Sequence, residues 1–207
     1  LERYGMTETT IIASNPLNAE RKPSSVGYPL PNVSAKVLGL EDQDLAAGQV
    51  GELVVRGPNV FNGYWNMPER TAAEFTSDGY FKTGDLVRMD EDGRVWIVGR
   101  AKDLIITGGY NVYPREVESA LNNIKGVRDS AVIGVRHPDF GEGVVAVVEL
   151  KEGSSNFDPK SAIAALSEKL AKYKVPKEIF VMPAIPRNAM GKIQKDKLRN
   201  QFSATFA

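Results

Sequence analysis

The sequence predicts an α+β protein in two parts, a β-rich part over residues 1–100 and a smaller α+β domain over residues 101–207. Two observations lead to this prediction. In the first hundred residues, short runs alternate apolar and polar side chains between turns rich in glycine and proline, which is strand periodicity. After Arg100, apolar residues recur at helical spacing, and strand-like runs lie between these segments.

The first part is expected to hold strands and one short helix. Strands are predicted over residues 33–37 and 52–56, where apolar and polar residues alternate or glycines bound the run. Residues 80–89 and 94–98 are predicted to form a hairpin, because an Asp/Gly turn separates them. Residues 68–75 predict a short helix with a proline near its start.

The second part is expected to alternate helices and strands. Pro114 stands at the start of one predicted helix, and Asp158 before Pro159 is placed to cap another. The helices are predicted over residues 114–123, 159–170 and 195–202, and the strands over residues 127–135, 144–150 and 179–182.

Composition excludes several classes of site and partner. Lys plus Arg and Asp plus Glu both number 26, so no global positive charge holds the chain on nucleic acid or an anionic membrane. Without cysteine, disulfides, zinc–thiolate sites and cysteine nucleophiles are excluded. No apolar run has the length of a membrane span. We therefore expect a cytoplasmic protein with no nucleic-acid or membrane partner. Because the sequence opens at Leu1 on a motif-like string, we also expect it to be a segment of a longer protein.

Two polar clusters in the first part carry side chains suited to a nucleotide. In residues 4–9, Tyr-Gly-Met-Thr-Glu-Thr, a ring can stack on a base, a hydroxyl can donate to a phosphate, and a carboxylate can hold Mg²⁺. In residues 80–85, Tyr-Phe-Lys-Thr-Gly-Asp, Asp85 at the end of a strand can accept from both hydroxyls of a ribose. Taken alone, each string is better explained as an ordinary polar turn.

A third cluster, residues 99–118, crosses the predicted domain boundary. Its Gly108-Gly109 pair lets a backbone approach a ligand closely, or forms a plain hairpin turn. Arg100 and Lys102 can reach a phosphate or ribose, or be solvated.

The fourth cluster is residues 186–192, Pro-Arg-Asn-Ala-Met-Gly-Lys. On such a loop Lys192 can bring its charge to phosphate oxygens as they gain negative charge, although most lysines lie on the surface without such a role. The sole histidine, His137, is followed by Pro138 and is expected to be structural.

In this order, the strings YGMTE, FKTGD, GRAKDLIITGGYNVYPREVE and PRNAMGK resemble those of the adenylate-forming superfamily, which includes acyl-CoA synthetases, firefly-type luciferases and peptide-synthetase adenylation domains. The resemblance spans the whole chain. It implies that residues 1–100 end the large N-terminal AMP-binding domain and that residues 101–207 are the small mobile C-terminal domain. It further implies a reaction of ATP with a carboxylic acid and then CoA, with domain rotation between the two steps.

The resemblance also implies roles for the nucleotide-binding residues. Tyr4 would stack on adenine, Thr7 would contact the phosphate, and Glu8 would hold Mg²⁺. Asp85 would bind the ribose hydroxyls of ATP or AMP, with Arg100 beside it.

Roles are likewise implied for the second part. Lys192 would bridge the carboxylate and the α-phosphate, and would be catalytic together with Thr7 and Glu8. Lys102 matches the hinge residue. Gly108, Gly109 and Tyr110 match the loop that lines the pantetheine tunnel for CoA.

Two positions depart from the pattern of many relatives. Asn188 stands where many carry Thr, and Ile106 stands where some carry Lys, so no lysine contribution is expected there.

The strings LPNVSAKV, GPNVFNGYWNMPERTAAEF, ITGGYNVYPREVES and AVIGVRHPDFGEGVVAVV look like those of malonyl-CoA synthetases, which implies malonate as the acid and a role in fatty acid metabolism. The family's acid pocket lies largely upstream of Leu1, so these residues do not identify the acid. Two alternatives stay open: a ligase for another small, medium-chain or aryl acid, and a nucleotide-binding module without catalysis. The family's phosphate loop, rich in Gly, Ser and Thr, is absent from these residues. Its presence in the parent protein would favour a ligase, and its absence would favour the binding module.

Overall fold

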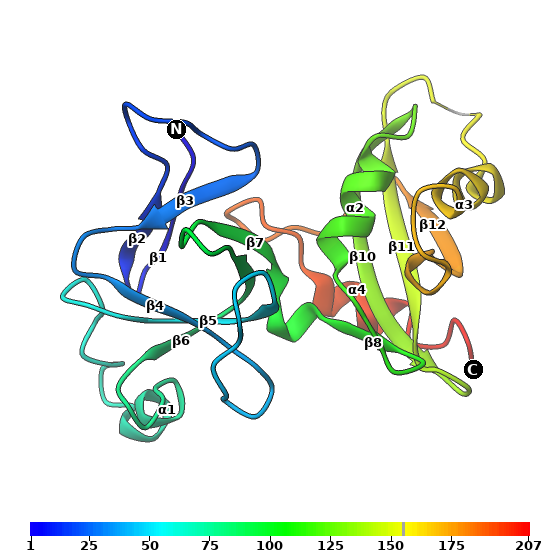
Figure 1. Ribbon diagram of the computed structural model, residues 1–207. Helices are drawn as coiled ribbons and strands as arrows, with labels where there is room; N and C mark the ends of the chain where they lie inside the picture. The colour runs from blue at the N-terminus through cyan, green and yellow to red at the C-terminus, as the bar shows by residue number, and fades with distance from the viewer. Residues whose placement is uncertain (155) are drawn as a thin grey trace. The chain divides into compact units, whose positions relative to one another are not determined.

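The computed structural model describes residues 1–154 and 156–207, and the chain divides into two compact units, Leu1–Lys102 and Asp103–Ala207 (Figure 1). Both units contain a sheet with helices, so the predicted α+β class is confirmed. In the described part of the chain, no helix combines the length and apolar character needed to cross a membrane.

The first unit is built on an antiparallel seven-stranded sheet in the order β1-β2-β3-β7-β6-β5-β4. A short helix, α1 (Pro68–Ala73), precedes β6. The strands are β1 (Arg3–Met6), β2 (Thr10–Ser14), β3 (Ser25–Pro29), β4 (Ser34–Leu38), β5 (Val50–Arg56), β6 (Phe81–Met89) and β7 (Val95–Arg100).

Strand β6 carries Asp85, the central residue of the candidate site in this unit. Its residues alternate between buried and half-buried positions, so Phe81, Thr83, Asp85 and Val87 share one buried face. The apolar members of this face belong to the core of the unit, together with Leu53 of β5. A carboxylate therefore stands on the core face of a central strand, where it needs partners.

The second unit has a five-stranded sheet around β11, the strand that pairs with three others. Strands β10 and β8 pair with it antiparallel, and β12 pairs with it parallel. The strands are β8 (Ile105–Thr107), β9 (Tyr110–Val112), β10 (Val127–His137), β11 (Gly141–Leu150) and β12 (Glu178–Met182).

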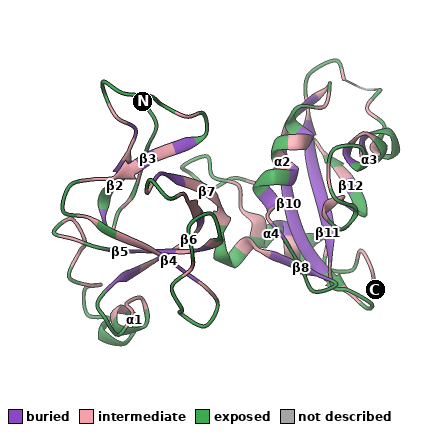
Figure 2. Cartoon of the chain, viewed as in Figure 1, coloured by how far each residue is buried: buried purple, intermediate pink, exposed green. Residues whose placement is uncertain are grey.

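Helices cover both faces of this sheet, which explains the unbroken valine-rich run in β11 (Figure 2). Val144, Ala146 and Val148 pack in the core that includes residues of α2 (Pro114–Asn122) and α3 (Pro159–Ser167). Val145 and Val147 point the other way, into the core that includes Leu198 of α4 (Lys195–Gln201).

The starts of helices α2 and α3 were predicted correctly because particular residue types favour the first turn of a helix. Pro114 and Pro159 occupy first-turn positions, and the Asp158 carboxylate accepts from the backbone N–H groups of Lys160 and Ser161. The hydrogen bonds to Ser161 and Lys160 lower the pKa of Asp158 from its ordinary value, so this cap stays ionised at neutral pH.

Several short strands were not predicted. Strands β1, β2 and β3 and the hairpin of β8 and β9 have three to five residues each, and they depend on pairing with neighbouring strands more than on a pattern along the sequence. The strands predicted over residues 127–135 and 144–150 were too short, because β10 runs to His137 and β11 begins at Gly141, which makes the connection between them tight.

Candidate functional site

The main polar cluster of the first unit is centred on Asp85, whose side chain is 6% exposed. Asp85 on β6 lies opposite Arg100 on β7 in the sheet register. The Arg100 Nε lies 2.9 Å from Asp85 Oδ1, and the Tyr4 hydroxyl donates to Asp85 Oδ2 at 2.5 Å. Each carboxylate oxygen is therefore held by a separate donor. One donor lies near the start of the unit's sequence and the other near its end.

The backbone on either side of Asp85 is also fixed. The Asp85 N–H donates to Thr83 Oγ1 at 3.2 Å, and that hydroxyl donates to the Leu53 carbonyl at 2.8 Å. Gly84 has φ of +69°, a conformation that a side chain disfavours, and its N–H donates to Glu52 Oε1 at 3.0 Å. The string FKTGD thus fixes the stretch of strand β6 that presents the Asp85 carboxylate.

The same contacts change the acidity of Tyr4. Burial first, and then the negative charge and hydrogen bond of Asp85, raise the pKa of the Tyr4 hydroxyl above its ordinary value. Tyr4 is therefore a neutral donor at physiological pH, and its ring packs against the core of the unit.

Thr7 and Glu8 lie in the turn that joins β1 and β2. Residues of the segment 59–64 hold this turn. The Asn59 amide donates to the Thr9 carbonyl at 2.8 Å, the Phe61 N–H donates to the Glu8 carbonyl at 2.8 Å, and the Tyr64 hydroxyl donates to Glu8 Oε1 at 3.1 Å.

Within the described residues, no group of three or more His, Cys, Asp or Glu side chains is arranged to hold a metal ion. Glu8 therefore fits a magnesium ion only in the way Mg²⁺ is commonly bound, through one carboxylate together with substrate phosphates and water.

The Gly108-Gly109 pair of the second unit forms the two-residue turn between β8 and β9. Both glycines have positive φ, +56° and +81°, as a type I′ turn requires, and Thr107 pairs with Tyr110 across it. The Gly108 N–H donates to the Phe140 carbonyl at 2.9 Å.

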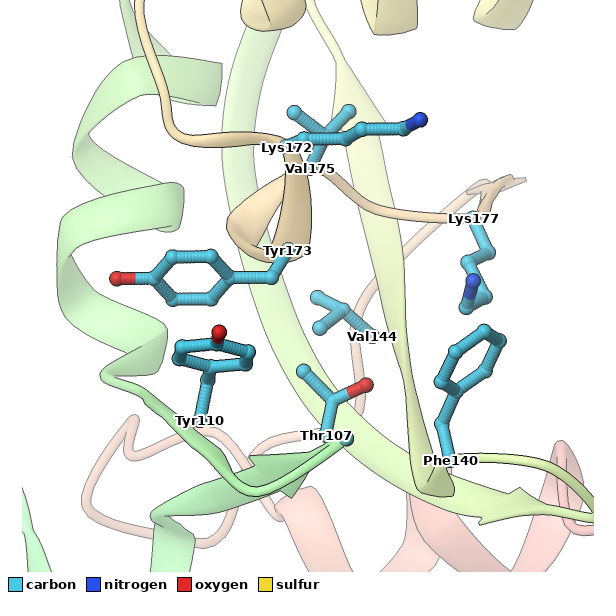
Figure 3. Close-up of a pocket in the computed structure, with 9 residues that line it drawn as sticks. Thr107, Tyr110, Phe140, Val144, Lys172, Tyr173, Val175 and Lys177 are labelled. Atoms are coloured by element: carbon cyan, nitrogen blue, oxygen red, sulfur yellow. The ribbon is translucent and has the colours of Figure 1, made fainter.

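This turn borders a pocket of about 470 Å³, drawn in Figure 3. The rings of Tyr110 and Tyr173 stack with centroids 4.7 Å apart, and Lys177 Nζ lies 4.2 Å from the centroid of the Phe140 ring. The lining residues are Thr107, Gly108, Tyr110, Phe140, Val144, Lys172, Tyr173, Val175 and Lys177. The pocket combines apolar walls with two exposed ammonium groups, those of Lys172 and Lys177.

Sequence reasoning found only Gly108 and Tyr110 among these lining residues. The segment 172–177, Lys-Tyr-Lys-Val-Pro-Lys, could have been noticed because it has three lysines beside a tyrosine and a proline. Residue spacing, however, does not reveal that this segment folds against the β8–β9 turn.

The remaining predicted residues lie elsewhere. Lys102 is in the short 3₁₀ turn η1 (Ala101–Asp103), and Lys192 is exposed on the loop between β12 and α4. Of the predicted residues, the structure brings Tyr4, Asp85 and Arg100 together in the first unit, and Gly108 and Tyr110 around the pocket of the second.

Comparison with known proteins gives two family matches that follow each other along the chain. The AMP-binding enzyme family matches residues 1–65, and the AMP-binding enzyme C-terminal domain matches residues 116–192. The chain belongs to the AMP-binding enzyme family.

Relatives of this chain are named for different acids. The chain is 43% identical over 209 residues to the malonate–CoA ligase of Arabidopsis thaliana, and the match covers 96% of this chain and 34% of the relative. It is 41% identical over 198 residues to the indoleacetate–CoA ligase of Aromatoleum aromaticum, covering 95% of this chain and 38% of the relative.

A solved structure gives the same family. ATP-bound MatB from Rhodopseudomonas palustris is 50% identical, with a TM-score of 0.94, and the match covers 100% of this chain and 41% of that one. The chain therefore spans well under half the length of the relatives that it matches.

The raised pKa of Tyr4 predicts a pH dependence of stability. The unfolded phenol has its ordinary pKa of 10.0 and the folded one a higher pKa, so the stabilisation is fully present below pH 10 and is lost as the pH rises toward the folded value. In urea titrations above pH 10, the free energy of unfolding should fall more steeply for the wild type than for Tyr4→Phe, by up to about 1.4 kcal/mol per pH unit.

Asp85→Asn should give an intermediate slope, because it removes the charge of Asp85 but not the burial of Tyr4. Equal slopes for the wild type and Tyr4→Phe would contradict the raised pKa of Tyr4, and equal slopes for the wild type and Asp85→Asn would contradict the coupling between Tyr4 and Asp85.

Proposed function

We propose that this chain is the nucleotide- and CoA-binding part of an ATP-dependent acyl-CoA ligase whose acid is malonate. The observation that carries the proposal is the preorganised carboxylate of Asp85. An ionised carboxylate offers about four acceptor sites. Arg100 contacts one oxygen and Tyr4 the other, and a carboxylate held in this way can accept from the two neighbouring hydroxyls of a ribose.

The turn of Thr7 and Glu8 supplies the groups for the phosphates. The Thr7 hydroxyl is exposed and would donate to a phosphate oxygen. Glu8, oriented by Tyr64, would hold Mg²⁺, which neutralises phosphate charge when bound with ATP.

The reaction proposed for the full-length protein has two steps. A carboxylate oxygen of the acid attacks the α-phosphorus of ATP, and the bond to pyrophosphate breaks. The Lys192 ammonium offsets the negative charge that gathers on the phosphate oxygens. The thiol sulfur of CoA then attacks the acyl carbon of the adenylate, and AMP leaves. Lys102, in its short 3₁₀ turn, is proposed as the hinge between the steps.

The pocket beside Gly108 and Gly109 fits CoA by its chemistry. Apolar walls and a turn without side chains suit the slender pantetheine arm, and the Tyr110–Tyr173 stack gives one wall a rigid surface. The ammonium groups of Lys172 and Lys177 would pair with the phosphates of CoA.

Similarity supports malonate as the acid, since relatives named malonate–CoA ligases are 43% identical to the chain. One observation favours a second candidate, an aryl acid, because an indoleacetate–CoA ligase is 41% identical over nearly the whole chain.

The direct test measures acid-dependent pyrophosphate release by the full-length protein with ATP and Mg²⁺. Malonate, methylmalonate, acetate, butyrate and indoleacetate are compared at equal concentration. We expect kcat/KM for malonate to exceed that for butyrate by at least about 100-fold, because a site built to pair a second carboxylate leaves its own charge unpaired with an acid that lacks one.

The other outcomes distinguish the alternatives. A preference for indoleacetate would show that the acid is not malonate, but it would still support an acyl-CoA ligase. Nucleotide binding without pyrophosphate release for any acid would favour the non-catalytic module.

The pocket assignment predicts a selective effect on CoA. The double variant Lys172→Gln/Lys177→Gln should raise the apparent KM for CoA about tenfold at low salt, and the difference should shrink as salt screens the charges. Pyrophosphate release without CoA should stay the same. Lys160→Gln, an exposed lysine at the start of α3, is the matched control. An unchanged KM for CoA in the double variant would place the phosphates of CoA elsewhere.

A further inference from the structure

The side chain of Asn188 closes the loop that carries Lys192. Its carboxamide oxygen accepts from two backbone N–H groups, those of Met190 at 3.0 Å and Lys192 at 2.9 Å. The Asn188 N–H donates to the Lys192 carbonyl at 2.9 Å, and the Gly191 N–H donates to the Asn188 carbonyl at 2.9 Å. Both backbone polar groups of Lys192 are therefore bonded to Asn188.

A second anchor ties the same loop to the sheet. Arg187 donates through Nη1 to the Gly191 carbonyl at 3.1 Å, and its Nη2 pairs with the carboxylate of Asp129 on β10. Arg187 also forms a β-bridge with Ile193 across the base of the loop. The base of the loop is thus fixed by backbone pairing and an ion pair. At its tip Arg187 holds the Gly191 carbonyl, and Asn188 holds the backbone of Lys192.

The tip needs this support for a physical reason. Gly191 has φ of +77°, and glycine gives the unfolded loop many other conformations, each of which moves Lys192. Lys192 is exposed, and its side chain is a flexible four-carbon stem, so packing does little to direct its ammonium group. Because Asn188 fixes the backbone of Lys192, it limits the space that the ammonium group explores.

We propose that Asn188 is a positioning residue for the adenylation step. It acts through Lys192, and this inference rests on the role that the proposed function gives to Lys192. The required feature is an uncharged acceptor oxygen near the position of Asn188 Oδ1. A threonine hydroxyl supplies such an oxygen and an alanine does not, which also explains how Asn188 can stand where many relatives carry Thr.

The test measures both half-reactions of the full-length protein. Adenylation is followed as acid-dependent exchange of pyrophosphate into ATP, and thioester formation is followed from preformed acyl-adenylate and CoA. Asn188→Ala should lower kcat for adenylation about 10- to 100-fold, as expected when a charged group is misplaced by about 1 Å, with the KM for ATP changed less than about twofold. Thioester formation should be unchanged, and Asn188→Thr should recover most of the loss.

Three control measurements separate this role from a general loss of structure. Asn200→Ala, an exposed asparagine in α4, should leave both half-reactions unchanged. Lys192→Ala should abolish adenylation and spare thioester formation. The thermal midpoint of each variant checks folding.

Two results would overturn the positioning role: an equal loss of both half-reactions in Asn188→Ala, or no recovery in Asn188→Thr. Normal adenylation by Lys192→Ala would instead overturn the role of Lys192 and with it that part of the proposed function, whatever Asn188→Ala does.

Discussion

The interaction on which the first unit depends is the pairing of Asp85 with Arg100 and Tyr4. A carboxylate on the core face of a strand costs free energy unless it is paired and hydrogen-bonded. Arg100 and Tyr4 meet this need from opposite ends of the unit, while Thr83 and Gly84 fix the backbone beside the charge. The arrangement leaves a charged acceptor already oriented before a ligand arrives, so a ribose would bind without first ordering the side chain.

The second unit is built differently, because its sheet is apolar on both faces and its proposed functional residues lie in the loops. Helices bury the valine-rich strand β11 from both sides. The Gly108-Gly109 turn and the loop of Asn188 and Lys192 extend from this rigid support. In both loops the backbone is shaped by glycine at positive φ and by hydrogen bonds, and the side chain proposed to react or to contact the ligand comes next along the chain.

Local sequence signals predicted part of this structure. The helices α2 and α3 were predicted since proline and Asp158 mark their starts, and β11 was predicted since its valine run is long. The candidate residues came from motif order, but their contacts did not. Tyr4 and Asp85 are 81 positions apart, and Lys177 reaches Phe140 only through the fold, so no local pattern could pair them. Short strands such as β8 depend on tertiary pairing, which propensity does not encode.

The central claim, that Asp85 is held ready for a ribose, is tested most directly by the affinity of the full-length protein for ATP and for 2′,3′-dideoxy-ATP, measured by calorimetry in the wild type and in Asp85→Asn. The account predicts that the wild type binds ATP at least about tenfold more tightly than the dideoxy analogue, because hydrogen bonds to a charged group are lost with the hydroxyls. In Asp85→Asn this ratio should fall toward one. The same ratio in both proteins would contradict the account.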